Sequence, residues 1–484
     1  MKFIFSMFFS ILAIGNAIGQ IWETEITPNI VILPPANYEQ ELKGYDIRET
    51  NDGNYVFAGN YKYGIVSNLA HSPVLAKLDA TTGNVIWLKE YPTFNGGYLQ
   101  EVSLVEKPNG NLLLAGINYN RIFLIETDAN GDTISTHQFA STCETVNNVG
   151  CNLRSVRLRA TNDGNYIIGI GSTGGLIGLP SPINQLIKIS PNNSIIWNKN
   201  YTNRFLLDVQ PTNDGGYIFS GSTAMSQPIL FKVDMNGDSL WQQTYSNMPI
   251  YDLHSVKETP DNGFVVACHA TGFAGNSPFL LKMDQTGTVS WQLPLGGQLG
   301  VARHVVVDPD GNYVVTGTNR VTHGGGFAVM LDAAFVTRVT AAGSILQHQI
   351  FDDMIDNSSR AVRYTTDGNF VLAGSHGASL GDQERGYVVK TGYYLNTLDI
   401  NEENTGIEVF PNPFKHQTTL RVNGGVYTAL KVQVFDALGR QVQQAFSTNG
   451  TEVILPRKDL ERGIYFFKLR DGQQIIGTGK LTIQ

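Results

Sequence analysis

The chain has 484 residues, of which 42% are hydrophobic and 16% are charged, and its formal net charge is −8. This length admits two or more domains with a sizeable core. The acidic balance and the absence of Lys/Arg clusters argue against nucleic acid or an anionic membrane as a partner, because both are bound through basic patches. Glycine is abundant, with 51 residues, and Asn-Gly and Asp-Gly pairs recur, which favours many short strands joined by tight turns.

Residues 1–19 have the pattern of a secretory signal peptide. Lys2 precedes an apolar segment from Phe3 to Ile14, and Ala17-Ile18-Gly19 is a small-residue cleavage site. Cleavage there leaves Gln20 as the new N-terminus. The apolar segment is too short for a spanning helix of about 20 residues, and no later segment is longer. We therefore expect export and no membrane span in the mature chain.

Residues 20–395 are dominated by a unit that recurs seven times. Each copy has a tight turn followed by an apolar strand, and the intervals between copies are 57, 54, 51, 48, 48 and 57 residues. A third strand carries an apolar-Lys-apolar pattern, as in Leu75-Ala-Lys77-Leu, and a fourth often carries Trp. Four strands in about 50 residues are typical of a propeller blade. The turns begin at Asp52, Asn109, Asp163, Asp214, Asn262, Asp310 and Asp367.

The two ends of the repeat region predict how the ring closes. The seventh copy lacks a Trp strand, whereas Gln20-Ile-Trp22-Glu-Thr-Glu-Ile26 matches Val85-Ile-Trp87-Leu-Lys-Glu-Tyr91. The fold class predicted is therefore all-β: a seven-bladed β-propeller in which the N-terminal strand closes the last blade and removes two exposed sheet edges. All five tryptophans fall at this strand position, which favours packing over ligand stacking. They are Trp22, Trp87, Trp197, Trp241 and Trp291.

The segment Leu78-Asp-Ala-Thr-Thr-Gly83-Asn-Val-Ile-Trp87 resembles a quinoprotein-type propeller repeat. In that family such a segment docks neighbouring blades through the Trp. The resemblance does not extend to the quinone cofactor, because those dehydrogenases carry adjacent cysteines and usually eight blades. We therefore expect no cofactor.

Three cysteines fit an exported protein that does not depend on disulfides. Cys143 and Cys151 share one polar loop and are a disulfide candidate. A metal site there lacks partner ligands at zinc-like spacing. Cys268 lies in an apolar run and is expected to be buried.

A polar linker at 396–406 precedes a second β-rich segment, residues 407–484. Alternation and turn residues predict a small antiparallel β-sandwich of some seven strands. The motifs Pro411-Asn412-Pro413, Asp436-Ala-Leu-Gly439-Arg440 and Leu460-Glu-Arg-Gly463-Ile-Tyr465 precede an apolar terminal strand. In this order they are similar to the type A C-terminal sorting domain of the type IX secretion system of Bacteroidetes. An ordinary β-sandwich used for binding is the alternative.

The resemblance implies export by the type IX machinery, removal of the domain, and release or attachment to the outer-membrane surface. Gly439 and Gly463 are expected in turns where a side chain would clash.

No catalytic motif stands out: the chain has no Gly-x-Ser-x-Gly elbow, no His-Glu-x-x-His and no P-loop. The Asp-Gly turns lack a full calcium-loop series, so no metal is expected. The connections between the second and third strands vary in length, as at 60–73, 171–184, 317–326 and 374–386. They are predicted to be loops on the face where the central channel opens, and binding generally concentrates in such loops.

Aligning the inner strands on their apolar residue predicts a polar ring at that channel mouth. The aligned positions are Asp46, Glu101, Ser155, Asp208, Ser255, His304 and Ala361, with His254, Arg303 and Arg360 nearby. Solvated strand starts and inter-blade hydrogen bonds are the plainer explanation. The first hypothesis is an exported propeller that binds a glycan or protein. The alternative is a secreted lyase or glycosidase that uses Asp46, Glu101 and Asp208, since a glycosidase needs paired carboxylates.

Overall fold

The structure, a computed structural model, describes residues 20–392 and 407–484 with short gaps. The gaps are 29–37, 66–67, 93–98, 119–120, 142–150, 175–182, 224–225, 247, 249, 273–274, 297, 324–328, 352–355, 378–383, 423–429, 436–440, 447–450, 459 and 472–473. The proposed signal peptide, Cys143, the side chain of Cys151, Gly439 and Arg440 lie outside the described residues. The chain separates into two compact units, one spanning Gln20–Tyr393 and the other containing Tyr394–Gln484. In the described ranges, no helix is long and apolar enough to cross a membrane.

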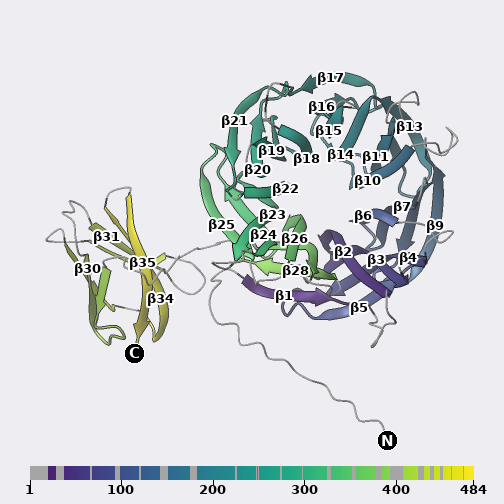
Figure 1. Cartoon of the computed structure of the whole chain (residues 1–484). Helices are drawn as coiled ribbons and strands as arrows, with labels where there is room; N and C mark the ends of the chain where they lie inside the picture. Colours follow the sequence, from purple (N-terminus) through teal and green to yellow (C-terminus); the bar gives the residue numbers. More distant parts are fainter. Residues whose placement is uncertain are drawn as a thin grey trace, which may run out of the picture. The chain divides into compact units, whose positions relative to one another are not determined.

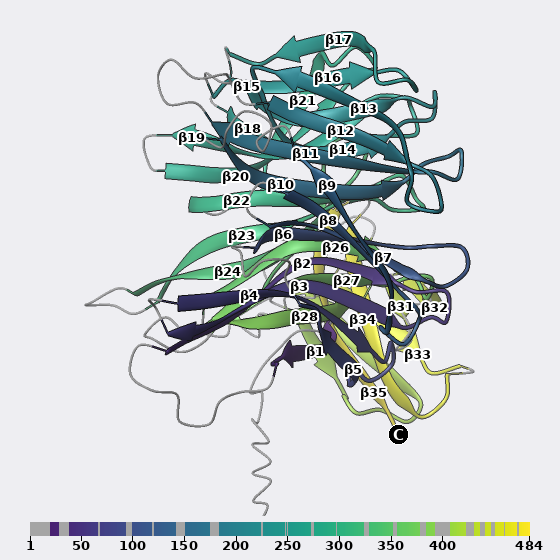
Figure 2. The same cartoon turned by 90° about the vertical axis from the view of Figure 1, so that its right-hand side faces the viewer.

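The first unit is an all-β propeller, as the repeats predict. Its described residues form seven four-stranded antiparallel sheets, and in Figure 1 the first strand of each repeat lies nearest to the centre of the ring. In the view turned by 90° (Figure 2), the blade strands run along the axis that Figure 1 looks down. We number the sheets as blades 1 to 7 in the order of their inner strands.

The strands of the blades have the following bounds. Blade 1 holds β2 (Tyr38–Glu49), β3 (Tyr55–Ile65), β4 (Asn68–Leu78) and β5 (Val85–Glu90); blade 2 holds β6 (Leu99–Glu106), β7 (Leu112–Asn118), β8 (Arg121–Thr127) and β9 (Thr133–Ala140); blade 3 holds β10 (Cys151–Ala160), β11 (Tyr166–Gly174), β12 (Ile183–Ile189) and β13 (Ile195–Thr202). Blade 4 holds β14 (Arg204–Pro211), β15 (Tyr217–Thr223), β16 (Pro228–Val233) and β17 (Ser239–Thr244); blade 5 holds β18 (Ile250–Glu258), β19 (Phe264–Gly272), β20 (Gly275–Met283) and β21 (Val289–Pro294). Blade 6 holds β22 (Gln298–Val307), β23 (Tyr313–His323), β24 (Val329–Val339) and β25 (Ile345–Phe351); blade 7 holds β26 (Asp356–Tyr364), β27 (Phe370–Gly377), β28 (Arg385–Thr391) and, at its outer edge, β1 (Gln20–Ile26).

The N-terminal strand β1 pairs antiparallel with β28, from Trp22 opposite Lys390 to Ile26 opposite Gly386. Trp22 also reaches the next blade: its Nε1 donates to the carbonyl of Ala80 at 3.1 Å. A Cβ built on Gly83, which has φ +74°, would lie 2.5 Å from the Trp22 ring. The indole thus occupies the space that a side chain at position 83 would need, and it joins blade 7 to blade 1.

The same Trp-on-Gly contact joins four other pairs of blades. The pairs are Trp87 on Gly131, Trp197 on Gly237, Trp241 on Gly287 and Trp291 on Gly343, and each glycine has a positive φ.

The two blades without Trp face neighbours that lack this glycine. Blade 2 has Ser135 at the Trp position and faces blade 3, whose corresponding turn carries Asn193 at φ +62°. Blade 6 has Gln347 there and faces blade 7, where no turn links β28 to β1 because β1 comes from the other end of the chain. The Trp therefore serves packing between blades wherever a glycine leaves room for it.

The lysine of the third strand forms an ion pair with the aspartate of the Asp-Gly turn in the same blade. Lys77 contacts Asp52 at 2.6 Å, and Lys188 contacts Asp163 at 2.6 Å. Lys188 also lies over the ring of Tyr217 in the next blade, 5.9 Å from the ring centroid. These turns are thus occupied by structural ion pairs. Where the structure describes the chain, no group of three or more His, Cys, Asp or Glu residues could hold a metal ion.

In blades 1 and 6 the long connections between second and third strands are hairpin arms rather than the expected loops, whereas at 171–184 and 374–386 most of the segment that links the two strands lies outside the described residues. In blade 1, β3 and β4 stay paired from Tyr55 opposite Leu78 to Ile65 opposite Asn68. In blade 6, β23 and β24 remain paired as far as His323 opposite Val329.

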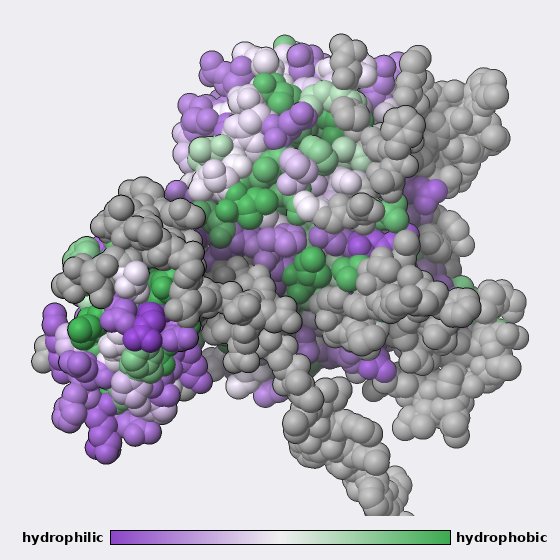
Figure 3. Space-filling model, turned by 60° about the vertical axis from the view of Figure 1, so that its left-hand side comes forward, coloured by the Kyte–Doolittle hydropathy of each residue, from purple (hydrophilic) through white to green (hydrophobic). Residues whose placement is uncertain are grey.

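The outer strands expose aliphatic side chains next to the Trp positions. On the face in Figure 3, hydrophobic (green) residues occur among hydrophilic (purple) ones. Exposed examples are Ile21, Ile86, Ile134, Ile196, Leu240 and Leu346.

The second unit is a β-sandwich of two sheets. One sheet has the order β29 (Ile407–Phe410), β30 (Gln417–Val422) and β33 (Glu452–Pro456); the other has β32 (Gln441–Phe446), β31 (Leu430–Phe435), β34 (Gly463–Asp471) and β35 (Gln474–Ile483). Their inner faces share one buried core that includes Leu420, Val432, Val453 and Phe467.

The motif residues hold the ends of this sandwich together. The Asn412 side chain, between Pro411 and Pro413, donates to the carbonyl of Lys480 at 2.9 Å and accepts from the Thr482 amide at 2.8 Å. It thereby fastens the entry segment to the terminal strand. Tyr465 donates to the carbonyl of Glu461 at 3.1 Å. The expectation that Gly463 lies in a turn where a side chain would clash is wrong. This residue starts β34, and a Cβ there would meet nothing closer than Tyr465 at 3.9 Å.

Candidate functional site

All seven inner strands of the propeller contribute to one polar pocket in the central channel. The pocket has an empty volume of about 330 Å³, part of which is open to solvent. It is lined by Tyr45, Asp46, Val102, Ser103, Arg157, Arg159, Asp208, His254, Arg303, His304, Arg360, Ala361 and Arg363.

Six of the seven predicted binding residues line this pocket, namely Asp46, Asp208, His254, Arg303, His304 and Arg360. Glu101 does not line it, but its carboxylate contacts Arg157, which does, at 2.5 Å. Cys268 is buried in β19, outside the pocket.

A β-bulge at one shared position turns side chains toward the channel. In blades 1, 4, 5, 6 and 7 the pairing of the first two strands skips one residue, and those residues are Tyr45, Leu207, His254, Arg303 and Arg360. A bulge re-aims the side chain of its extra residue, and four of these five side chains line the pocket. Since each inner strand ends at the Asp-Gly turn, the bulge lies toward the opposite face, where the hairpin arms are.

The bulges also correct the alignment of the polar ring. Asp46 pairs with Ala58, five residues after the turn glycine, and the equivalent pairs are Ser103 with Ala115 and Arg157 with Gly169. The ring positions in blades 2 and 3 are therefore Ser103 and Arg157 rather than Glu101 and Ser155. The sequence alignment failed because the bulges of these two blades lie at other positions in the strand.

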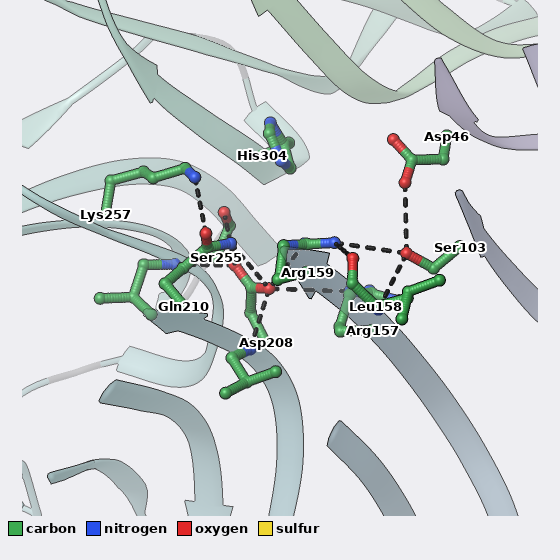
Figure 4. Close-up of polar contacts among 12 residues, drawn as sticks. Asp46, Ser103, Arg157, Leu158, Arg159, Asp208, Gln210, Ser255, Lys257 and His304 are labelled. Atoms are coloured by element: carbon green, nitrogen blue, oxygen red, sulfur yellow. Dashed lines mark hydrogen bonds and ion pairs between the residues drawn. The ribbon is translucent and has the colours of Figure 1, made fainter. Parts of the chain in front are cut away.

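The corrected ring forms a chain of hydrogen bonds from blade to blade (Figure 4). Asp46 accepts from the Leu104 amide and from the Ser103 hydroxyl, both at 3.2 Å. Ser103 in turn accepts from the Leu158 amide of the third blade at 3.1 Å. Blades 4 to 6 repeat this arrangement: Asp208 accepts from the Ser255 hydroxyl at 3.1 Å and the Val256 amide at 3.3 Å.

At the ring position, aspartate occurs in the two blades that follow a blade with no hydrogen-bond acceptor at that position. Blade 7, before Asp46, has Ala361 at the ring position, and blade 3, before Asp208, has Arg157. In both places the aspartate uses its second oxygen for the amide of its own neighbour, Ile47 at 3.0 Å and Val209 at 2.9 Å. Because a buried amide without an acceptor is costly, the two carboxylates have a structural role that a hydroxyl could not fill.

Arginines two residues beyond the ring position neutralise these aspartates. Arg363 contacts Asp46 at 2.5 Å, and Arg159 contacts Asp208 at 2.9 Å. Burial opposes ionisation of Asp46, but the charges of Arg48 and Arg363 outweigh it and hold the pKa of that carboxyl well below its usual range. A glycosidase acid needs a raised pKa, so Asp46 is unsuited to that role.

The surroundings of three basic groups in the channel favour the uncharged form of each and lower its pKa. Burial, and then the charge of Arg303, lowers the pKa of His254 well below its usual value. Burial and Arg363 do the same to the pKa of His304. Burial and Arg159 lower the pKa of Lys257 to about 7. At neutral pH the channel thus contains uncharged imidazoles between arginines.

Sequence reasoning missed Tyr45, Ser103, Arg157, Arg159 and Arg363 as lining residues. A signal was present in the strand period, because residues two apart share one face of a strand. Counting two residues on from the ring position gives Arg48, Arg159, Lys257 and Arg363.

Residues 408–484 match the family described as the secretion system C-terminal sorting domain. No curated protein matches the chain. Among solved structures, the Dos1 propeller is 12% identical with a TM-score of 0.41, covering 72% of this chain and 78% of that one. A protein of unknown function from Dyadobacter fermentans is 9% identical with a TM-score of 0.44, covering 77% and 98%. NanB sialidase from Streptococcus pneumoniae, as a K499G mutant, is 10% identical with a TM-score of 0.40, covering 78% and 71%.

The C-terminal unit is therefore a sorting domain of the type IX secretion system, and the chain is destined for secretion, with release or attachment at the cell surface.

Proposed function

We propose that the mature protein is an exported, non-catalytic binding propeller of a Bacteroidetes cell, with its ligand site at the channel mouth on the face of the hairpin arms. Residues 1–19 direct it across the inner membrane, and the sorting domain directs it through the type IX machinery. The ligand is a glycan or a protein.

The observation that carries the binding proposal is the shared bulge. It turns Tyr45, His254, Arg303 and Arg360 into the pocket from four consecutive blades, 5, 6, 7 and 1. A bulge disrupts the ladder locally, and side chains at this position are not needed for the ring of inter-blade hydrogen bonds. Polar groups presented in this way from rigid strands are typical of a recognition site.

The carboxylates support binding over hydrolysis. Asp46 and Asp208 are each engaged by an arginine and by backbone amides of two blades, and Glu101 is paired with Arg157. Groups held in this way are poorly placed to exchange protons with a substrate.

The purified mature protein should be applied to a glycan array and, in parallel, to a panel of polysaccharides for degradation. We expect binding without degradation, and we expect His254→Ala to weaken it. His137→Ala, in the outer strand β9, is the matched control and should bind normally. Degradation of any polysaccharide by the purified protein would show that it is an enzyme instead.

Export is tested separately in a host with a type IX system. Deleting residues 407–484 should leave the protein in the periplasm. Asn412→Ala, which removes both contacts to β35, should reduce export, whereas Lys415→Ala at an exposed neighbouring position should not. Normal export of the truncated chain would overturn the assignment of this route.

A further inference from the structure

The charges that line the central channel do not balance. Five arginines line the pocket against two carboxylates, although the whole chain carries a net charge of −8. Each carboxylate near the channel already has a partner: Asp46 has Arg363, Asp208 has Arg159 and Glu101 has Arg157. Arg303 and Arg360 are the lining arginines left over in the described part of the chain.

Arg303 and Arg360 are adjacent, unneutralised cations. They occupy the same bulge position in neighbouring blades 6 and 7. Among the described residues, the buried Nε atoms of both have no hydrogen-bond partner, and Arg303 makes neither a hydrogen bond nor an ion pair. Arg360 lies over the ring of Tyr45, 5.0 Å from its centroid.

The carboxylates that act on Arg303 from a distance are engaged elsewhere. Glu101 is paired with Arg157, and Asp332 contacts Arg320 at 3.0 Å. Burial and the charge of Arg360 lower the pKa of Arg303 to about 10. Holding two partly buried cations side by side is unfavourable. An arrangement of this kind is retained where an anion supplies the missing charge, because guanidinium groups bind oxyanions through paired, charge-assisted hydrogen bonds.

We infer that Arg303 and Arg360, with His254 beside them, form a binding site for an oxyanion: a carboxylate, sulfate or phosphate group at the end of a larger ligand. This inference names the chemistry recognised by the site proposed above and rests on that proposal. The charged group would be the part of the ligand that enters the pocket, which lies in the central channel and is lined by all seven inner strands. The bulk of the ligand would then lie outside, against the face of the hairpin arms.

The test measures the melting temperature of the mature protein with acetate, sulfate or phosphate, each against sodium chloride at equal ionic strength. We expect at least one oxyanion to raise it above the chloride control. Comparing glucuronate with glucose tests whether a carboxylate on a sugar is enough to raise the melting temperature. The measurements with sulfate and with phosphate test the other two oxyanions.

Arg303→Met separates a binding role from a structural one. If Arg303 is an unpaired binding cation, its removal relieves repulsion, so the variant should melt no lower than the wild type without ligand and should lose the oxyanion shift. An arginine with a structural role would lower the melting temperature when removed. Arg360→Met should behave like Arg303→Met, and affinity for the effective anion should fall at least tenfold in both. Arg121→Met, on the exposed end of β8, is the control and should keep the shift.

The inference is overturned if no oxyanion exceeds chloride, or if Arg303→Met and Arg360→Met keep the full shift. Ligands found on the array whose binding survives both substitutions would leave the binding proposal standing while this inference fails. If an oxyanion shift is seen and is lost in both variants, but no ligand is found on the array, the oxyanion site stands and the proposal of a glycan ligand loses its support.

Discussion

Replacing Trp22 by alanine should weaken the contact that closes the ring. Trp22 is the only tryptophan contributed by the N-terminal strand, and it joins blade 7 to blade 1 through Ala80 and Gly83. Its ring also contacts Tyr55, with centroids 6.0 Å apart. The other blades are continuous in the chain, so only this interface depends on a strand that pairs across the whole sequence of the propeller.

The cost can be worked out from these contacts. Loss of the indole hydrogen bond removes about 1 kcal/mol, and loss of a partly buried aromatic side chain removes roughly 2 kcal/mol. A total of about 3 kcal/mol corresponds to a melting temperature lowered by roughly 4 °C for a domain of this size. The mature chain should be used, with calorimetry for the melting temperature and hydrogen exchange for the site of opening.

Ile21→Ala is the matched control, because Ile21 is the neighbouring residue of the same strand and is 49% exposed. It should change stability by less than about 0.5 kcal/mol. Trp22→Ala should also accelerate exchange in β1 and β28 and leave blade 4 unchanged. Equal melting temperatures for the two variants, or equal acceleration in all blades, would refute the role assigned to Trp22.

Three further substitutions test other parts of the argument. The hydrogen bond with His376 and the nearby Arg385 outweigh the effect of burial and lower the pKa of Glu25 from 4.5 to about 2. The stabilisation that ionised Glu25 provides is therefore present above pH 4.5 and is lost as the pH falls towards 2. Because Glu25 is partly exposed, Glu25→Gln should cost only about 1 kcal/mol at pH 7, and a stability difference that persists at pH 2 would contradict this. Gly83→Ala should cost more than Gly53→Ala in thermal melts, because both have a positive φ but only position 83 meets Trp22; equal losses would be inconsistent with the Trp-on-Gly packing. Asp46→Asn should cost about 3–5 kcal/mol in denaturant unfolding, because it leaves Arg363 without its counter-charge; a neutral outcome would show that the ion pair is dispensable.

The repeat pattern determined much of the architecture from the sequence alone. Turn residues every 48 to 57 positions and Trp at one strand position were enough to predict an all-β propeller. They also predicted the pairing of the N-terminal strand that the structure has between β1 and β28. This worked because turns and alternation are local properties, and repetition states the same local signal many times. The sorting domain was recognisable for a similar reason, as several short motifs in a set order, and the family match confirms it.

The candidate site followed from the sequence only in part. Polar residues at the ends of the inner strands pointed to the channel, but Ser103 and Arg157 were displaced by two positions in the alignment. A bulge adds one residue to a strand without leaving a signal in its composition, so the register between blades cannot be read from a single chain. The partners of each charge were equally hidden. Arg363 and Asp46 lie 317 residues apart, and only closure of the ring brings them together. The tertiary structure thus decided which of the pocket's arginines meet a carboxylate and which two do not meet one among the described residues, because that depends on contacts between blades and not on neighbours in sequence.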